Sequence, residues 1–304
     1  MWIVYISLTI VETILLYVSG LTLFDSFNHS LTTLSTGGFS TFNSSVSNFS
    51  QQSKAIINVF MYLAGISFIL LLRTFRSRSL NDFFKSTEFK FYTSIVLGSS
   101  TIFFAKTYSI STGISEALND AFFTSLTLIT TTGFTNLNYE DWNINYRTYI
   151  LGLMFLGGMA GSTAGGIKTI RVIALLKSVR NEIRKIFYPN AIFKIRMSKS
   201  ILPEKMIESV QTFFILYVAI FVMGTFALSI SINTFGNAIS FEGVLSAVAS
   251  AMNNIGPGLA EIGPVENYYF LDSTSKVILS ILMVIGRLEI FPIAILLYKK
   301  TWKS

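Results

Sequence analysis

The chain has 304 residues, of which 51% are hydrophobic and only 13% are charged. A soluble domain carries about 25% charged residues, so this composition excludes a soluble protein and indicates an integral membrane protein with several spans. The chain has no cysteine, which excludes disulfides and thiolate metal sites. Its single histidine, His29, excludes a histidine-rich metal site and is expected to be solvated in an outer loop.

The positive charges are concentrated in three segments. Residues 73–90, 168–205 and 299–303 hold five, ten and three of the 23 lysines and arginines. Residues 231–272 hold acidic residues and no lysine or arginine. By the positive-inside rule the three basic segments face the cytoplasm and the acidic segment faces outside, in a multi-pass protein of the cell membrane. Because the basic segments alternate with apolar spans, they do not indicate a nucleic-acid surface.

The first stretch of the chain contains two apolar spans with a shorter apolar segment between them. Residues 1–19 are just long enough to cross a bilayer, and residues 56–72 form a second predicted span. Residues 23–34 are too short to cross, and such a run is typical of a re-entrant helix. A loop, Ser35-Thr36-Gly37-Gly38-Phe39, follows that short segment.

The same order of elements occurs twice more. In the second copy, a span at 89–105 and a short segment at 116–129 precede a loop at 130–135 and a long apolar segment from about residue 145. In the third copy the corresponding segments are 211–230, 241–252, 253–258 and 276–298. This recurrence predicts three parallel repeats, 1–80, 81–200 and 201–304, each of which enters and leaves on the same side.

The glycine loops point to a cation filter. Backbone carbonyls in an extended loop can replace the hydration shell of an ion, and glycine permits the positive φ that such a loop needs. The short helix ends at the loop, so its negative C-terminal end faces the cation. One such loop would indicate only a turn, but Gly37, Gly133 and Gly256 take the same place in three copies. The predicted filter residues are Ser35, Thr36, Gly37, Gly38, Thr131, Thr132, Gly133, Phe134, Asn254, Ile255, Gly256 and Pro257. The aromatic rings of Phe39 and Phe134 are expected to pack rather than to bind cations.

The long apolar segment of the second copy is interrupted at residues 157–168, which contain five glycines. Each glycine costs a helix about 1 kcal/mol relative to alanine, and lipid cannot satisfy the freed backbone groups. The interruption therefore predicts a water-filled path beside it, although small residues also permit close helix packing. A phosphate-binding P-loop is not indicated, because Ile167 separates Gly166 from Lys168.

Together these motifs resemble the Trk/Ktr/HKT superfamily of cation transport proteins. The three glycine loops resemble the second, third and fourth filter segments of that superfamily, and residues 157–168 resemble its intramembrane gating loop. Gly286-Arg287-Leu288-Glu289 resembles the inner-helix motif of its fourth repeat. The resemblance covers nearly the whole chain and implies gated, channel-like uptake of potassium or sodium through four units, with no cofactor. The gating residues that it implies are Gly157, Gly158, Gly161, Gly165, Gly166, Lys168 and Arg287.

The chain departs from the superfamily pattern in having three units, and the first unit is the one that is missing. The predicted fold is an all-α integral membrane protein with a pseudo-fourfold pore that lacks one quarter. Either the chain is a fragment or another polypeptide supplies the first unit. Glycine in all three filters favours potassium, but the deciding position lies in the absent filter. Glu12, a carboxylate in the first span, is expected to be neutral or paired with the missing unit.

Two features have alternative interpretations. Arg287 lies in an apolar span, where a charge needs a partner or a cavity, so it either pairs with Glu289 to tie helices together or faces the pore below the filter. Residues 168–205 are expected to extend as a helix along the membrane surface. That helix would contact anionic lipid or dock a cytosolic nucleotide-binding regulatory subunit, which the resemblance implies. A homodimer is also expected.

Other functional classes fit the sequence less well. A proton- or sodium-coupled symporter remains the alternative, but such transporters commonly contain inverted repeats, whereas these repeats are parallel. An inactive fragment that needs a separate first repeat is a further alternative. An enzyme is not expected, because no histidine–glutamate zinc motif or Ser/His pair occurs at membrane depth.

Overall fold

The computed structural model describes residues 2–79, 81–191, 193–198, 200–235, 239–298 and 301. These residues form helices and one short hairpin. The helices are α1 Trp2–Val18, α2 Leu23–Leu34, α3 Gln51–Ala64, α4 Phe68–Ser77, α5 Asn81–Lys85, α6 Thr87–Thr107, α7 Ile114–Ile129, α8 Ile144–Met154, α9 Thr169–Phe187, α10 Glu204–Phe235, α11 Phe241–Asn253, α12 Ser273–Leu288 and α13 Ile290–Leu297. Strand β1 (Arg196–Met197) pairs antiparallel with β2 (Ser200–Ile201), and a 3₁₀ turn spans Ala260–Ile262.

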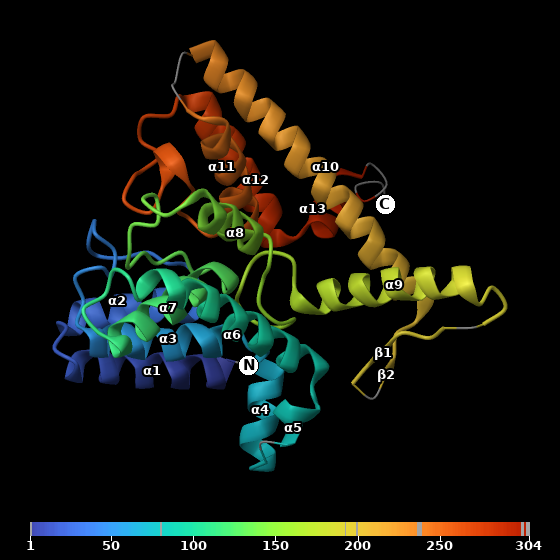
Figure 1. Cartoon of the computed structure of the whole chain (residues 1–304), viewed down its shortest axis with the longest axis horizontal. Helices are drawn as coiled ribbons and strands as arrows, with labels where there is room; N and C mark the ends of the chain where they lie inside the picture. Colours follow the sequence, from blue (N-terminus) through green and yellow to red (C-terminus); the bar gives the residue numbers. More distant parts are fainter. Residues whose placement is uncertain are drawn as a thin grey trace.

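The helices form two packed groups with α8 between them (Figure 1). One group contains α1, α2, α3, α6 and α7, around a core that includes Met61, Tyr92 and Phe123. The other contains α10, α11 and α12, around Leu228, Val248 and Leu282. The amphipathic helix α9 contacts α6 and α10 and extends sideways from the helical body, with the β1–β2 hairpin beside its middle (Figure 1).

The apolar helices are bent more often than the sequence predicted. Within the described residues, α10 alone is long and apolar enough to cross a bilayer unaided. The pairs α3–α4 and α12–α13 are each apolar enough to cross together but bend by 96° and 107°. The predicted interruption near Glu289 is confirmed, since this residue ends α12 with φ of 64°.

The predicted span over residues 56–72 is not a single helix, because α3 ends at Ala64 and α4 starts at Phe68. Gly65, at the break, lies so close to α6 that an added Cβ would be 2.2 Å from Tyr92 Oη. The break is therefore enforced by a contact between helices, which the local sequence does not reveal.

The prediction of a helical extension over residues 168–205 is correct only as far as Phe187. Pro189 follows, and proline removes a backbone donor and clashes with a preceding helical turn. The chain then returns through the hairpin, which is attached to α9 by a hydrogen bond from Lys177 Nζ to Arg196 O, 2.6 Å.

The short helices α2, α7 and α11 contain 12, 16 and 13 residues, too few to cross a bilayer. Most of α7 and α11 is buried on all sides, and the polar residues of α2 are buried as well. Each of these helices ends at one of the glycine loops, so the loops are held in the protein interior.

Candidate ion pathway

The three glycine loops share one backbone conformation. Each short helix is followed by a residue in the left-handed region, with φ of 53° at Thr36, 54° at Thr131 and 56° at Asn254. Two residues later a glycine has positive φ in every copy: 65° at Gly38, 83° at Gly133 and 114° at Gly256.

This register corrects one assignment made from the sequence. Gly38, not Gly37, corresponds to Gly133 and Gly256, and Gly37 corresponds to Thr132. The first loop contains two consecutive glycines, so the sequence alone allows either alignment. Hydrogen bonds agree with the corrected register, because Thr32 Oγ1 donates to Phe39 O and Thr127 Oγ1 donates to Phe134 O, each at 2.8 Å.

The loops lie side by side and touch through their backbones. A Cβ added to Gly38 would lie 1.9 Å from Thr132 O, and one added to Gly133 would lie 1.6 Å from Ile255 O. Only glycine fits at these two contacts. At the corresponding position of Gly256, no atom of the described residues lies within 4 Å of an added Cβ. The three loops therefore form a consecutive series that is open at one end.

The glycine-rich segment 157–168 lies against all three loops. Thr36 Oγ1 donates to Thr163 O at 2.9 Å, and Gly165 N donates to Thr131 Oγ1 at 2.6 Å. At the third loop, a Cβ on Gly165 would lie 2.3 Å from Asn253 O. The structure thus brings the predicted gating segment directly beneath the predicted filter residues.

The same segment is hydrogen-bonded to the break between α3 and α4. Met159 N donates to Gly65 O at 2.9 Å, and Phe68 N donates to Gly161 O at 3.1 Å. Two interrupted helices therefore satisfy each other's freed backbone groups, which lipid could not do. Lys168 Nζ donates to the carbonyl of Ala164 within the segment, so its charge is directed at loop carbonyls.

Arg287 reaches the same place from α12. Its Nη2 donates to Ser35 O at 3.1 Å and its Nη1 to Thr163 O at 3.3 Å. Glu289 instead forms an ion pair with Arg171 of α9, with Nη2–Oε2 at 2.5 Å. Of the two interpretations of Arg287, the geometry favours a position at the filter over a pair with Glu289.

Glu88 is a functional candidate that the sequence did not indicate. Its Oε1 accepts hydrogen bonds from Ala160 N at 2.7 Å and Thr169 Oγ1 at 2.9 Å. One carboxylate at the start of α6 thereby holds residues near both ends of the glycine-rich segment. In the sequence Glu88 stands in a basic, surface-like stretch, and no local pattern marks it.

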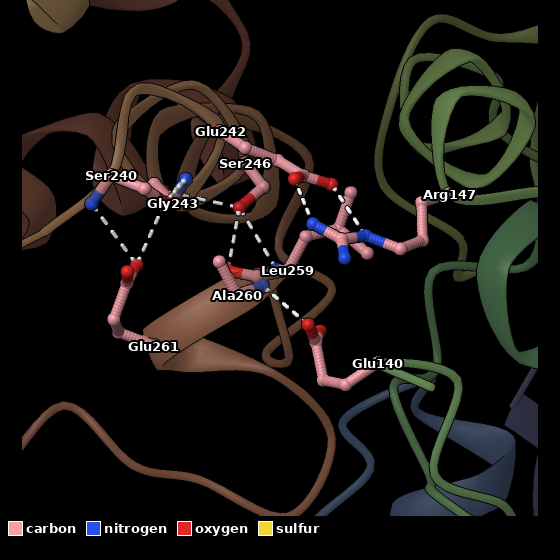
Figure 2. Close-up of polar contacts among 9 residues, drawn as sticks. All are labelled: Glu140, Arg147, Ser240, Glu242, Gly243, Ser246, Leu259, Ala260 and Glu261. Atoms are coloured by element: carbon pink, nitrogen blue, oxygen red, sulfur yellow. Dashed lines mark hydrogen bonds and ion pairs between the residues drawn. The ribbon is translucent and has the colours of Figure 1, made fainter. Parts of the chain in front are cut away.

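A polar cluster joins the second and third copies near the starts of α8 and α11 (Figure 2). Arg147, at the start of α8, forms a bidentate ion pair with Glu242, at the start of α11. Glu140 Oε2 accepts from Ala260 N at 2.8 Å. Burial raises the pKa of Glu140 above its ordinary value, although the Ala260 N–H and Arg147 oppose that rise.

Residues 1–303 match the model of a family described as TrkH, cation transport protein. The chain belongs to this family. It is 30% identical over 310 residues to the "Trk system potassium uptake protein TrkH" of Escherichia coli K12, covering all of this chain and 62% of that protein. The protein of the same name from Vibrio parahaemolyticus is 32% identical over 309 residues, again with 62% of its length covered.

The crystal structure of the potassium transporter TrkH from V. parahaemolyticus superposes with a TM-score of 0.89 at 32% identity. The match covers 99% of this chain and 64% of that one. The chain therefore has the helical fold of a TrkH-family membrane transporter, in a family of transporters rather than enzymes, and spans somewhat less than two thirds of the relatives that it matches. The resemblance inferred from the motifs is confirmed.

Some side chains in this TrkH-family chain lie where the sequence did not place them. His29 is fully buried in α2, and the prediction of a solvated outer loop is wrong. Its Nδ1 donates to Asp25 O at 2.7 Å, and Ser40 Oγ lies 2.8 Å from its Nε2. The buried carbonyl and hydroxyl satisfy both ring nitrogens, which removes the need for water.

Three further expectations have mixed outcomes. Phe134 is fully buried, as a packing role requires, but Phe39 is 74% exposed among the described residues. Glu12 is fully buried, and neither of its carboxylate oxygens has a hydrogen-bond partner among the described residues. The expectation that Glu12 is neutral or paired with the missing unit stays a prediction.

Proposed function

We propose that the chain supplies three quarters of a potassium-uptake pore in the cell membrane. The contact of adjacent filter loops, carbonyl to glycine, is the observation that supports this proposal most strongly. Carbonyl coordination of a dehydrated cation requires several equivalent loops arranged side by side around one axis. Loops that contact their neighbours in consecutive order fit this requirement. The potassium-uptake names of the relatives agree with it.

The open end of the series indicates what is missing. Gly38 and Gly133 each face a carbonyl of the next loop, whereas the space beside Gly256 is empty among the described residues. By the same register, the carbonyl of Gly37 would face a glycine of a fourth loop. A fourth unit of the same kind therefore fits between the third loop and the first, supplied by a separate polypeptide or by a longer chain.

In this pore, the predicted filter carbonyls replace the hydration shell of potassium, and the C-terminal ends of the three short helices add negative potential. The segment 157–168 acts as a movable gate beneath them. Arg287 places a positive charge at the same level, where it raises the electrostatic barrier to a cation. Displacement of the segment opens the path.

The charge pattern gives the orientation and the partners of the proposed pore. The basic segments face the cytoplasm, and the basic helix α9 projects from the helical body (Figure 1). We assign α9 and the hairpin as a cytoplasmic surface for anionic lipid or a nucleotide-binding regulatory subunit. The pore protein is a homodimer in this proposal.

Rubidium uptake by potassium-uptake-deficient cells tests the function. Cells that express this chain together with the first unit of a TrkH relative, here called the combined parts, should take up rubidium. Cells that express either part alone should not. Persistent uptake by proteoliposomes without a sodium or proton gradient distinguishes a channel from a coupled symporter. Absence of uptake by the combined parts, both present in the membrane, contradicts the proposal.

A further inference from the structure

A buried carboxylate behind each of the first two filter loops is tied to the residue that follows the loop. Thr41 Oγ1 donates to Asp25 Oδ1 at 2.6 Å, and Asn136 Nδ2 donates to Asp120 Oδ1 at 3.0 Å. Donor and acceptor are 16 residues apart in both cases. Two units of different sequence therefore contain the same connection at the same register.

The second of these connections is well protected from water. Asp120 is 3% exposed and Asn136 is 6% exposed. Lys54, on the neighbouring helix α3, is 6% exposed and acts on Asp120 electrostatically. Burial of a carboxylate is unfavourable unless hydrogen bonds and opposite charge compensate it. Asn136 and Lys54 provide this compensation for Asp120.

Helix capping does not explain the pair of aspartates. Asp25 lies in the first turn of α2 and also accepts from the N-cap residue Thr22, as in a capping box. Asp120, however, lies inside α7, well beyond its first turn. A capping role is therefore available to Asp25 but not to Asp120, while the bond to the end of the loop is common to both.

The third unit also has a carboxylate beside its short helix, but it comes from a different position and has different partners. Gly243 stands where the aspartate would be, eleven residues before the left-handed residue Asn254, and a Cβ there would lie 2.6 Å from Glu261 Oε2. Glu261 follows the third loop and accepts from Ser240 N at 3.2 Å and Ser240 Oγ at 2.9 Å (Figure 2). Here the carboxylate belongs to the 3₁₀ turn after the loop, and both donors belong to Ser240, the N-cap residue of α11.

We propose that Asp25, Asp120 and Glu261 are positioning residues that fix the outer ends of the three filter loops and so set the discrimination between potassium and sodium. Carbonyl oxygens select between ions by their number, spacing and field, all of which depend on a held loop. The selectivity part of this inference rests on the proposed function, whereas the positioning part does not.

Hydrogen exchange of the purified full chain in detergent tests the positioning part without transport. Asp120→Ala should speed the exchange of amides 131–136 about tenfold, since one buried hydrogen bond is lost, and leave α10 unchanged. Asp120→Asn retains an acceptor for Asn136 and should preserve protection, as should the exchanged pair Asp120→Asn/Asn136→Asp. Asp141→Ala, an exposed aspartate bonded to Asn138 away from the filter, is the matched control.

A second variant tests the positioning role at an exposed residue, in case Asp120→Ala disturbs folding at its buried site. Thr41→Val removes an exposed donor in the first unit and should speed exchange only around residues 36–40. Unchanged exchange at the loops in both Asp120→Ala and Thr41→Val would overturn the positioning role.

Flux through the combined parts tests selectivity. Asp120→Ala should lower the rubidium-to-sodium uptake ratio about tenfold, and Asp120→Asn should restore it. An unchanged ratio despite faster loop exchange overturns the selectivity part. If the combined parts with the parent sequence transport no ion, the proposed function is contradicted. Faster loop exchange in Asp120→Ala would still support the positioning role in that case.

Discussion

At the scale of single residues, the contact between neighbouring loops leaves no room for a side chain. Gly133→Ala would place a Cβ 1.6 Å from Ile255 O at a φ of 83°. We expect a Tm several degrees lower, since left-handed alanine alone costs about 1–2 kcal/mol, and loss of rubidium uptake in the combined parts. Thermal unfolding and uptake measure the two effects.

Gly98→Ala is the matched control, because an added Cβ at this helical glycine meets no atom of the described residues within 4 Å. It should retain uptake and stabilise α6 by about 1 kcal/mol, the ordinary preference of helices for alanine. A Gly133→Ala protein as stable and active as Gly98→Ala would contradict the loop-to-loop contact.

Glu140 makes the polar cluster at the starts of α8 and α11 sensitive to pH. Because burial raises its folded-state pKa above the ordinary carboxyl value of 4.5, its contribution to stability is full below that pH and is lost as pH rises through the folded pKa. Glu140→Gln retains an acceptor for Ala260 N. We expect this variant to have a higher Tm than the parent at pH 7, with a smaller difference at pH 4. The same Tm difference at both pH values would contradict this assignment.

Arg287 brings a positive charge to the first glycine loop, where we propose the filter. Arg287→Ala should raise cation leak through the combined parts, because it removes both the positive charge and the bonds to Ser35 and Thr163 carbonyls. Arg180→Ala, on the projecting helix α9, is the control. Unchanged rubidium and sodium flux in Arg287→Ala would remove the proposed barrier.

At the scale of elements, the glycine-rich segment is held in place by other helices. Glu88→Ala removes the hydrogen bond of the partly buried Ala160 N, which a net contribution of about 0.5–1.5 kcal/mol makes measurable. The segment should then open more often. A thiol placed by Ser162→Cys in this cysteine-free chain reports on that opening, and its modification should be faster in Glu88→Ala.

Glu182→Ala is the control for this experiment, since Glu182 lies on the surface of α9 and pairs with Lys185. Its modification rate at residue 162 should equal that of the parent. Equal rates in all three proteins would show that Glu88 does not restrain the segment.

At the scale of the whole molecule, the open end of the filter series makes Gly256 informative. Gly256→Ala meets no described atom within 4 Å, so in the chain alone it should cost only the strain of its φ of 114°. In the combined parts the added methyl group would meet the carbonyl of the fourth loop. We expect the Tm of the chain alone to fall by the few degrees that this backbone strain costs, less than for Gly133→Ala, and co-purification with the first unit to be lost. Undiminished co-purification contradicts the proposed site of the fourth loop.

Several features were predictable from sequence because they repeat or depend on local composition. The threefold recurrence of a short apolar segment and a glycine loop predicted the helical membrane fold and the region of the filter. Five glycines in residues 157–168 predicted the interruption after α8. An eleven-residue spacing from Asp25 to Thr36 and from Asp120 to Thr131 was also present, but it acquires meaning only once the loop register is known.

Other features depended on contacts between distant segments. The bend at Gly65 lies where Tyr92 approaches the backbone, and the burial of His29 follows from packing against the rings of Phe49 and Phe134. From sequence, either Gly37 or Gly38 could align with Gly133 and Gly256. The φ angles and hydrogen bonds of the folded loop show that Gly38 is the equivalent residue. By itself, the sequence determined which segments are apolar, short or glycine-rich, because these are local properties. Only the tertiary structure decided which backbone groups of those segments satisfy one another, because partners such as Glu88 and Ala160 are brought together by the fold.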